Sequence, residues 1–289
     1  RGKALIIGVA GEEMLREALA VANQSDVIVA ALGESSEMSG ESSSRTELGI
    51  PDVQQQLLKE LLKTGKPVVL VLFTGRPLTL EWEEKNVPAI LNVWFGGSEA
   101  GYAVADVLFG DVNPSGKLTA TFPRNVGQVP IYYAHKNTGR PLAEGKWFEK
   151  FRSNYLDVPN DPLYPFGFGL SYSQFTYSDI KLSAASFRPG QSITASVTLT
   201  NNSKVTGKEV VQLYIRDLVG SVTRPVKELK GFEKVELKAG ESRTVSFTIN
   251  AETLKFYNYD LKYVAEPGDF NVFIGGNSRD VKEASFKLQ

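Results

Sequence analysis

Short apolar runs alternate with helical periodicities along the first 110 residues of the chain. Residues 25–32 start with a polar pair and continue as an unbroken apolar run, which is typical of a parallel strand covered on both faces. Similar apolar runs occupy residues 68–73 and 89–94. We therefore expect three buried strands in this part of the chain.

Helical segments are expected around these strands. Apolar side chains recur at three- and four-residue intervals in residues 13–21, 53–63 and 98–109. Asp52 is expected to cap the second helix and Gly65 to end it. Strand and helix alternating with short connections predict an α/β sandwich domain, with a mostly parallel sheet and helices on both faces.

The second half of the chain has a period of two. Apolar residues alternate with Ser and Thr in residues 193–199, and the pattern returns in residues 211–215, 245–249 and 270–274. Turn residues such as Pro-Gly and Asn-Asn separate these segments. This pattern predicts an immunoglobulin-like β-sandwich, and the absence of cysteine favours the fibronectin type III variety.

The two patterns meet in an irregular segment. Residues 122–165 contain six prolines among many aromatic residues, which suggests an ordered, packed crossover. We assign residues 1–165 to the α/β domain, including an irregular linker from about residue 122, and residues 166–289 to the sandwich domain.

Composition removes several classes of function. The 289 residues include 32 basic and 33 acidic side chains, no cysteine and one histidine. Disulfides, thiolate metal sites, cysteine nucleophiles and sites that need several histidines are therefore excluded. A net charge of −1 provides no basic field for nucleic acid, and no apolar run reaches the roughly 18 residues of a membrane helix. We interpret the start at Arg1, without Met or a signal segment, as processed or truncated.

Glycine-containing segments do not predict a nucleotide site. In residues 111–118, a phosphate-binding loop would need Gly at Asp111 and Ser or Thr at Leu118. Residues 8–11 lack the glycine spacing of a dinucleotide fingerprint. No cofactor and no metal are implied.

The segment following the first predicted strand holds the main candidates for chemistry. Residues 33–47 contain Glu34, Glu37, Glu41 and Glu47 among six serines, and ligands of open α/β sheets bind beyond the carboxyl ends of strands. A carboxylic acid with a raised pKa could donate a proton there, and Arg45 could pair with one of the four glutamates. A solvated polar loop explains the same residues equally well, so both interpretations stay open.

Other candidates are weaker. His135 is expected to be a structural hydrogen-bonding residue, because no second histidine or acidic cluster accompanies it. Trp94, on a predicted strand, is expected in the core. Trp147 lies in the irregular segment and could stack against the apolar face of a sugar.

Several stretches together resemble the carboxy-terminal half of glycoside hydrolase family 3, most closely bacterial β-glucosidases of the periplasmic type. They match in order and spacing from near the start of the chain to its end. These stretches are Ser39-Gly40-Glu41 with Arg45-Thr46, residues 65–72, Gly101 with residues 105–110, and residues 113–118, 135–141, 163–172 and 224–232.

The resemblance implies a catalytic role for this chain. Members carry a barrel domain, an α/β sandwich domain and often a fibronectin-like domain, and they remove terminal β-linked glucose with retention of configuration. Their Gly-Glu element, followed by an Arg four residues on, matches Gly40, Glu41 and Arg45, so the resemblance implies that Glu41 is the acid/base. We also predict that Ser39, Arg45 and Trp147 contact the substrate.

The same resemblance implies what the chain lacks. The nucleophile is an aspartate of the barrel, which would precede Arg1, and the α/β domain is expected to be truncated at its start. This chain alone is therefore predicted to be inactive.

Partners and location follow from the same family. The expected partners are a β-glucoside or oligosaccharide substrate and the upstream barrel of the same protein, and the chain could form a homodimer. Nucleic acid and a membrane span are not expected. The location is expected to be periplasmic or secreted.

Two alternatives stay open. One is a non-catalytic carbohydrate-binding or scaffold module, and the other is a related β-xylosidase, N-acetylglucosaminidase or phosphorylase-like enzyme.

Overall fold

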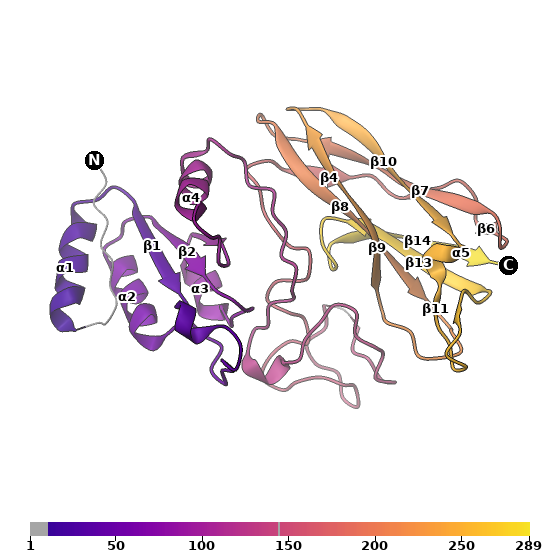
Figure 1. Cartoon of the computed structure of the whole chain (residues 1–289), viewed down its shortest axis with the longest axis horizontal. Helices are drawn as coiled ribbons and strands as arrows, with labels where there is room; N and C mark the ends of the chain where they lie inside the picture. The colour runs from indigo at the N-terminus through magenta and orange to yellow at the C-terminus, as the bar shows by residue number, and fades with distance from the viewer. Residues whose placement is uncertain (1–10, 144) are drawn as a thin grey trace. The chain divides into compact units, whose positions relative to one another are not determined.

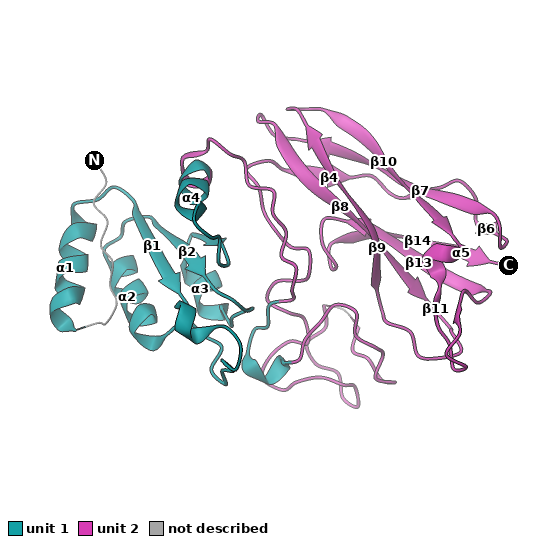
Figure 2. Ribbon diagram, viewed as in Figure 1, with its two compact units in different colours: residues 1–106, 122–129 teal, residues 107–121, 130–289 magenta. Residues whose placement is uncertain are grey.

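A computed structural model describes residues 11–143 and 145–289 (Figure 1). The chain forms two compact units (Figure 2). The first comprises Arg1–Asp106 and Phe122–Val129, and the second comprises Val107–Thr121 and Pro130–Gln289.

The first unit contains a parallel three-stranded sheet with strand order β1-β2-β3 (Figure 1). The strands are β1 (Ile28–Gly33), β2 (Val68–Phe73) and β3 (Ala89–Asn92). The helices are α1 (Glu12–Asn23), α2 (Asp52–Lys63), α3 (Glu81–Asn86) and α4 (Ala100–Phe109), with a 3-10 turn η2 at Val126–Gln128. The last three residues of α4 belong to the second unit. The predicted α/β class is confirmed.

The burial of the outer strands differs from the prediction. In β1, Ile28 and Ala30 are buried, whereas Val29 is 51% exposed. β3 contains no buried residue, and only β2, the central strand, is largely enclosed. The prediction of three fully buried strands was therefore wrong for β1 and β3, because an apolar run cannot reveal that a strand lies at the margin of its sheet.

The ends of α2 also differ in part from the prediction. Pro51 is the N-cap, no side chain caps the helix, and Asp52 is the first helical residue. The expected Asp52 cap was therefore wrong, although its carboxylate still lies at the positive end of the helix dipole. Gly65, with a φ of 71°, follows the C-cap Thr64 and ends the helix as predicted.

The second unit contains a β-sandwich of two main sheets (Figure 1). The first sheet pairs β10 (Ser242–Asn250), β7 (Ser192–Asn201) and β4 (Phe175–Tyr177), with β5 (Lys181–Leu182) also pairing with β7. The second has the order β6 (Ser186–Phe187), β14 (Val281–Leu288), β13 (Gly268–Gly275), β8 (Gly207–Asp217) and β9 (Glu228–Leu237). A short helix α5 (Ala251–Leu254) and the hairpin β11 (Phe256–Tyr257) and β12 (Tyr263–Val264) complete it.

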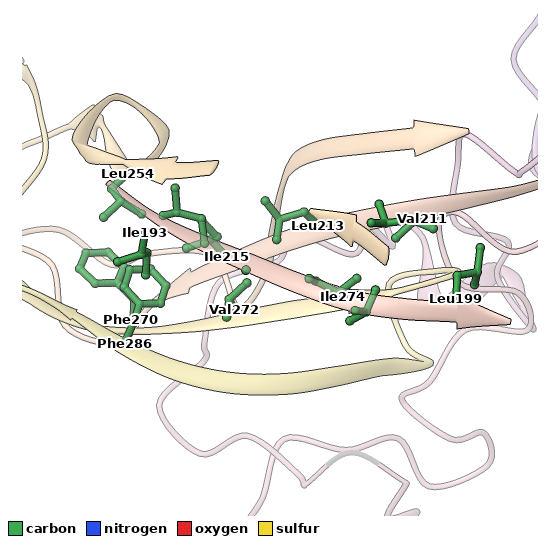
Figure 3. Close-up of a cluster of buried hydrophobic side chains, with 14 of the residues drawn as sticks. Ile193, Leu199, Val211, Leu213, Ile215, Leu254, Phe270, Val272, Ile274 and Phe286 are labelled. Atoms are coloured by element: carbon green, nitrogen blue, oxygen red, sulfur yellow. The ribbon is translucent and has the colours of Figure 1, made fainter. Parts of the chain in front are cut away.

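Alternating apolar residues of the two sheets form the core of the sandwich (Figure 3). Ile193 and Leu199 from β7 contribute to the same cluster as Leu213 from β8 and Ile274 from β13. The predicted sandwich is confirmed. The pattern did not single out β9 or β14, because β9 is a sheet edge and β14 has only the two-residue β6 on one side.

Part of the irregular segment packs within the second unit. The Tyr133 ring stacks on Phe166 with centroids 4.4 Å apart, and its hydroxyl accepts a hydrogen bond from the Leu229 N–H at 3.3 Å. The Val226 N–H donates to the His135 carbonyl at 2.9 Å. These contacts bring residues near 133 to the β8–β9 region of the sandwich, whereas the domain boundary at residue 165 stays a prediction.

Candidate active site

The loop between β1 and α2 begins at Gly33, where any larger residue would require the neighbouring backbone to move. Gly33 has a φ of 131°, and a Cβ built there would lie 1.9 Å from the Phe73 carbonyl oxygen. Its N–H donates to Gln54 Oε1 at 2.7 Å, and Gln54 Nε2 donates to its carbonyl at 3.0 Å. The start of the loop is therefore tied both to β2 and to α2.

The residue after this glycine, Glu34, is buried among cationic and hydrogen-bonding groups. Arg45 Nη1 donates to its Oε1 at 2.9 Å, and Arg76 Nε lies 3.0 Å from the same oxygen without the alignment of a hydrogen bond. The Thr74 hydroxyl and the Gly75 N–H donate to Oε2 at 3.0 and 3.1 Å. We call these five residues the Glu34 cluster.

The Glu34 cluster keeps its carboxylate ionised. Burial acts to raise the pKa of Glu34, but the Arg45 hydrogen bond, the Gly75 and Thr74 donors and the Arg76 charge outweigh burial and lower it. A carboxylate that is enclosed and charge-paired in this way cannot serve as a proton donor near neutral pH. Glu34 is thereby removed from the four candidates.

The middle of the loop faces solvent. A 3-10 turn η1 (Ser36–Met38) leads into residues 40–43, where the Ser43 N–H donates to the Gly40 carbonyl at 3.2 Å and Ser42 has a φ of 60°. Glu41 is exposed within this turn, and its carboxylate makes no hydrogen bond or ion pair with any other residue in the described part of the chain. The Glu41 carboxylate is therefore available to a ligand or a neighbouring domain. Glu37 and Glu47 are also exposed and are available in the same way.

Arg45 pairs with Glu34. Its Nη2 also donates to the Gly49 carbonyl at 3.2 Å, so both terminal nitrogens bind groups of this chain. Its side chain is 20% exposed. The sequence did not show which glutamate pairs with Arg45, and in the structure the partner is the buried Glu34. The contact of Arg45 with substrate stays a prediction.

The remaining candidates are spread over the two units. Ser39 is half-buried, and a Cβ built on Gly75 would lie 1.9 Å from its Oγ, so its side chain lies directly against that glycine. Trp147 is 54% exposed and belongs to the second unit. The structure therefore brings Ser39 and Arg45 into one loop with Glu41 and places Trp147 in the other unit.

Two further aromatic predictions have mixed outcomes. His135 is exposed, and its Nδ1 lies 3.3 Å from the carbonyl of the adjacent Lys136, so its structural role stays a prediction. Trp94 is half-buried with a φ of 52°, and its ring lies 5.8 Å from that of Phe122. The Trp94 prediction was therefore correct in its packing and wrong in expecting full burial.

Sequence reasoning missed Thr74, Gly75 and Arg76, which complete the Glu34 cluster. They follow β2 directly, and β2 is paired in parallel with β1. Because the carboxyl ends of adjacent parallel strands meet at one sheet edge, the segment after residue 73 could have been connected with the loop after residue 33.

Neither a metal site nor a membrane span is found in the described residues. In residues 11–143 and 145–289, no group of three or more His, Cys, Asp or Glu side chains is arranged to hold a metal ion. Among the helices of the described residues, none has the length and apolar character needed to cross a membrane.

Two family models match this chain. The model of the glycosyl hydrolase family 3 C-terminal domain matches residues 4–172, and that of the fibronectin type III-like domain matches residues 209–278.

Relatives match almost the whole chain. A periplasmic beta-glucosidase of Salmonella typhimurium is 54% identical over 96% of this chain and 36% of its own length. A beta-xylosidase of Formosa agariphila is 45% identical over 96% of this chain and 38% of its own. The crystal structure of a beta-glucosidase from Listeria innocua in complex with glucose is 45% identical, with a TM-score of 0.92 over 97% of this chain and 39% of that one. This chain thus spans a little over a third of the length of these relatives, and it belongs to glycoside hydrolase family 3.

Proposed function

We propose that this chain supplies the acid/base carboxyl, Glu41, of a retaining, exo-acting β-glucosidase. The observation that carries the proposal is the contrast within one loop: Glu34 is enclosed and ion-paired, whereas Glu41 is exposed and unpaired among the described residues. The match of Gly40, Glu41 and Arg45 to the family's acid/base element supports the choice of Glu41 over Glu37 and Glu47.

Glu41 acts twice in the proposed reaction. In the first step, its carboxylic acid gives a proton to the glycosidic oxygen while an aspartate nucleophile attacks the anomeric carbon, so the aglycone leaves as an alcohol. In the second step, the Glu41 carboxylate takes a proton from water, which attacks the anomeric carbon and releases glucose and the aspartate. The two carboxyl groups of a retaining enzyme lie about 5–5.5 Å apart.

The nucleophile is proposed to come from an upstream barrel domain of the same protein. The share of the relatives' length that this chain covers, 36% for the Salmonella protein, supports a larger active protein. The periplasmic relative supports a periplasmic or secreted location. The homodimer stays a prediction, which the molar mass of the full-length protein from light scattering would test.

Substitution of the three exposed glutamates of the loop tests the role of Glu41. In the full-length enzyme, Glu41→Gln is expected to lower kcat/KM for p-methoxyphenyl β-glucoside by about 10²–10⁴-fold. The loss should be far smaller with 2,4-dinitrophenyl β-glucoside, whose leaving group departs without a proton. Glu37→Gln and Glu47→Gln are the matched controls, and an equal effect in either of them would contradict the assignment.

A second candidate function is β-xylosidase activity, favoured by the Formosa relative at 45% identity. The ratio of kcat/KM for p-nitrophenyl β-glucoside and β-xyloside in the full-length enzyme separates the two. A ratio above one supports the glucosidase, and a ratio below one supports the xylosidase. Turnover of either substrate by residues 1–289 alone would show that the nucleophile lies within this chain.

A further inference from the structure

The turn that carries Glu41 has few contacts of its own. Within residues 40–43, the bond from the Ser43 N–H to the Gly40 carbonyl closes the turn, and Ser43 Oγ donates to the Glu41 carbonyl at 3.4 Å. Neither bond ties the turn to the sheet. An exposed turn with only local bonds would sample many positions, and an acid/base group must be held near its substrate.

One side chain connects this turn to the sheet from both sides. Arg76, three residues past the end of β2, donates from Nη2 to the Met38 carbonyl at 2.5 Å and to the Ser43 carbonyl at 2.9 Å. These two carbonyls directly flank residues 39–42. The guanidinium of Arg76 therefore spans the base of the turn and fixes the separation of its two ends.

The Glu34 carboxylate holds this guanidinium in orientation. Arg76 Nε lies 3.0 Å from Glu34 Oε1, and the side chain of Glu34 has no exposed surface. The carboxylate is fixed in turn by Thr74 and Gly75, which lie between β2 and Arg76. A rigid sheet edge is thus linked to the turn through one buried carboxylate and one planar cation.

We propose that Arg76 is a positioning residue for Glu41, oriented by Glu34, and that it sets where the Glu41 carboxyl meets the glycosidic oxygen. This inference rests on the proposed acid/base role of Glu41. The planar guanidinium carries several N–H donors in a fixed arrangement, so it can contact two carbonyls and a carboxylate at once. Lysine has one ammonium group and cannot reproduce that arrangement.

The test uses the leaving-group dependence of the full-length enzyme. Arg76→Met should lower kcat/KM for p-methoxyphenyl β-glucoside by about 10²-fold, the size expected when a catalytic group moves by about 1 Å. The loss with 2,4-dinitrophenyl β-glucoside should stay within about threefold, because that substrate needs no proton from Glu41. Arg76→Lys should show the same selective loss, and Lys63→Met, which removes an exposed cation of the same unit, should show none.

A double variant separates positioning from a general effect on folding. If Arg76 acts through Glu41, Arg76→Met combined with Glu41→Gln should be no slower than Glu41→Gln alone on the p-methoxyphenyl substrate. Equal losses on both substrates, or additive losses in the double variant, would overturn the inference.

The outcomes also distinguish this inference from the proposed function. If Glu41→Gln itself shows no selective loss, the acid/base assignment fails. If Glu41→Gln shows it and Arg76→Met retains wild-type leaving-group dependence, only the positioning role fails. If Arg76→Met does not fold, Arg76→Lys takes its place, because it keeps a cation beside the buried Glu34 carboxylate and loses only the arrangement of donors. It should show the same selective loss, and an unselective loss would overturn the inference.

Discussion

Removing the charge of Glu34 should destabilise the first unit strongly at neutral pH. The carboxylate has no exposed surface and receives two guanidinium groups at 2.9 and 3.0 Å as well as the Thr74 and Gly75 donors. Breaking a buried pair costs about 3–5 kcal/mol, but the two arginines are 20% and 21% exposed, which lowers the expected loss for Glu34→Gln to roughly 2–4 kcal/mol.

The pH dependence of this loss has a definite sign. The pKa of Glu34 in the folded state lies below its ordinary value of 4.5, so the folded protein binds the proton more weakly than the unfolded chain does. Its contribution to stability is therefore complete above pH 4.5 and disappears as the pH falls through the folded-state pKa. The difference between wild type and Glu34→Gln should shrink in the same range.

Urea unfolding followed by tryptophan fluorescence measures both quantities. A Trp147→Phe background leaves Trp82 and Trp94, which report on the first unit. Glu60→Gln is the matched control, because the Lys63 ammonium that pairs with Glu60 is 69% exposed, and it should cost less than about 0.5 kcal/mol. A Glu34→Gln loss as small as the control's, or a difference that grows on acidification, would refute the reasoning.

Three further predictions concern the stability of residues 1–289. Lys117→Met should lower the free energy of unfolding in urea by about 3–5 kcal/mol, because the buried Glu209 carboxylate, 3.0 Å from the Lys117 Nζ, loses its cation. Adding Glu209→Gln should recover much of this loss, and additive losses would contradict the reasoning. Gly33→Ala should lower the melting temperature of the first unit, because its methyl group would meet the Phe73 carbonyl at 1.9 Å; an unchanged value in a scanning calorimeter would show that the backbone adapts. Ile274→Ala should cost about 2–5 kcal/mol at the centre of the sandwich, and a loss below 1 kcal/mol measured in urea would mean that the core refills the space.

Local periodicity was sufficient to identify most of the elements. The period of two in residues 193–199 reports directly which side chains face the core of the sandwich, and these residues are buried in β7 as expected. The apolar run of residues 68–73 likewise became β2. What periodicity could not show is the place of each strand in its sheet, so β1 and β3 were expected to be more enclosed than they are.

The pairing of charges in the candidate site was beyond the sequence. Four glutamates within 14 residues are equivalent as residue types, and Arg45 is close to several of them along the chain. Only the parallel pairing of β1 with β2 brings Thr74, Gly75 and Arg76, about 40 residues away in sequence, to the carboxylate of Glu34.

The amino-acid sequence by itself determined the two kinds of domain, the absence of thiol chemistry and the loop in which a proton donor should be sought. These properties depend on composition and on short-range periodicity, which do not depend on tertiary contacts. The tertiary structure decided which glutamate is buried and charged and which is exposed, because burial and ion pairing depend on groups that meet only when separate strands pair.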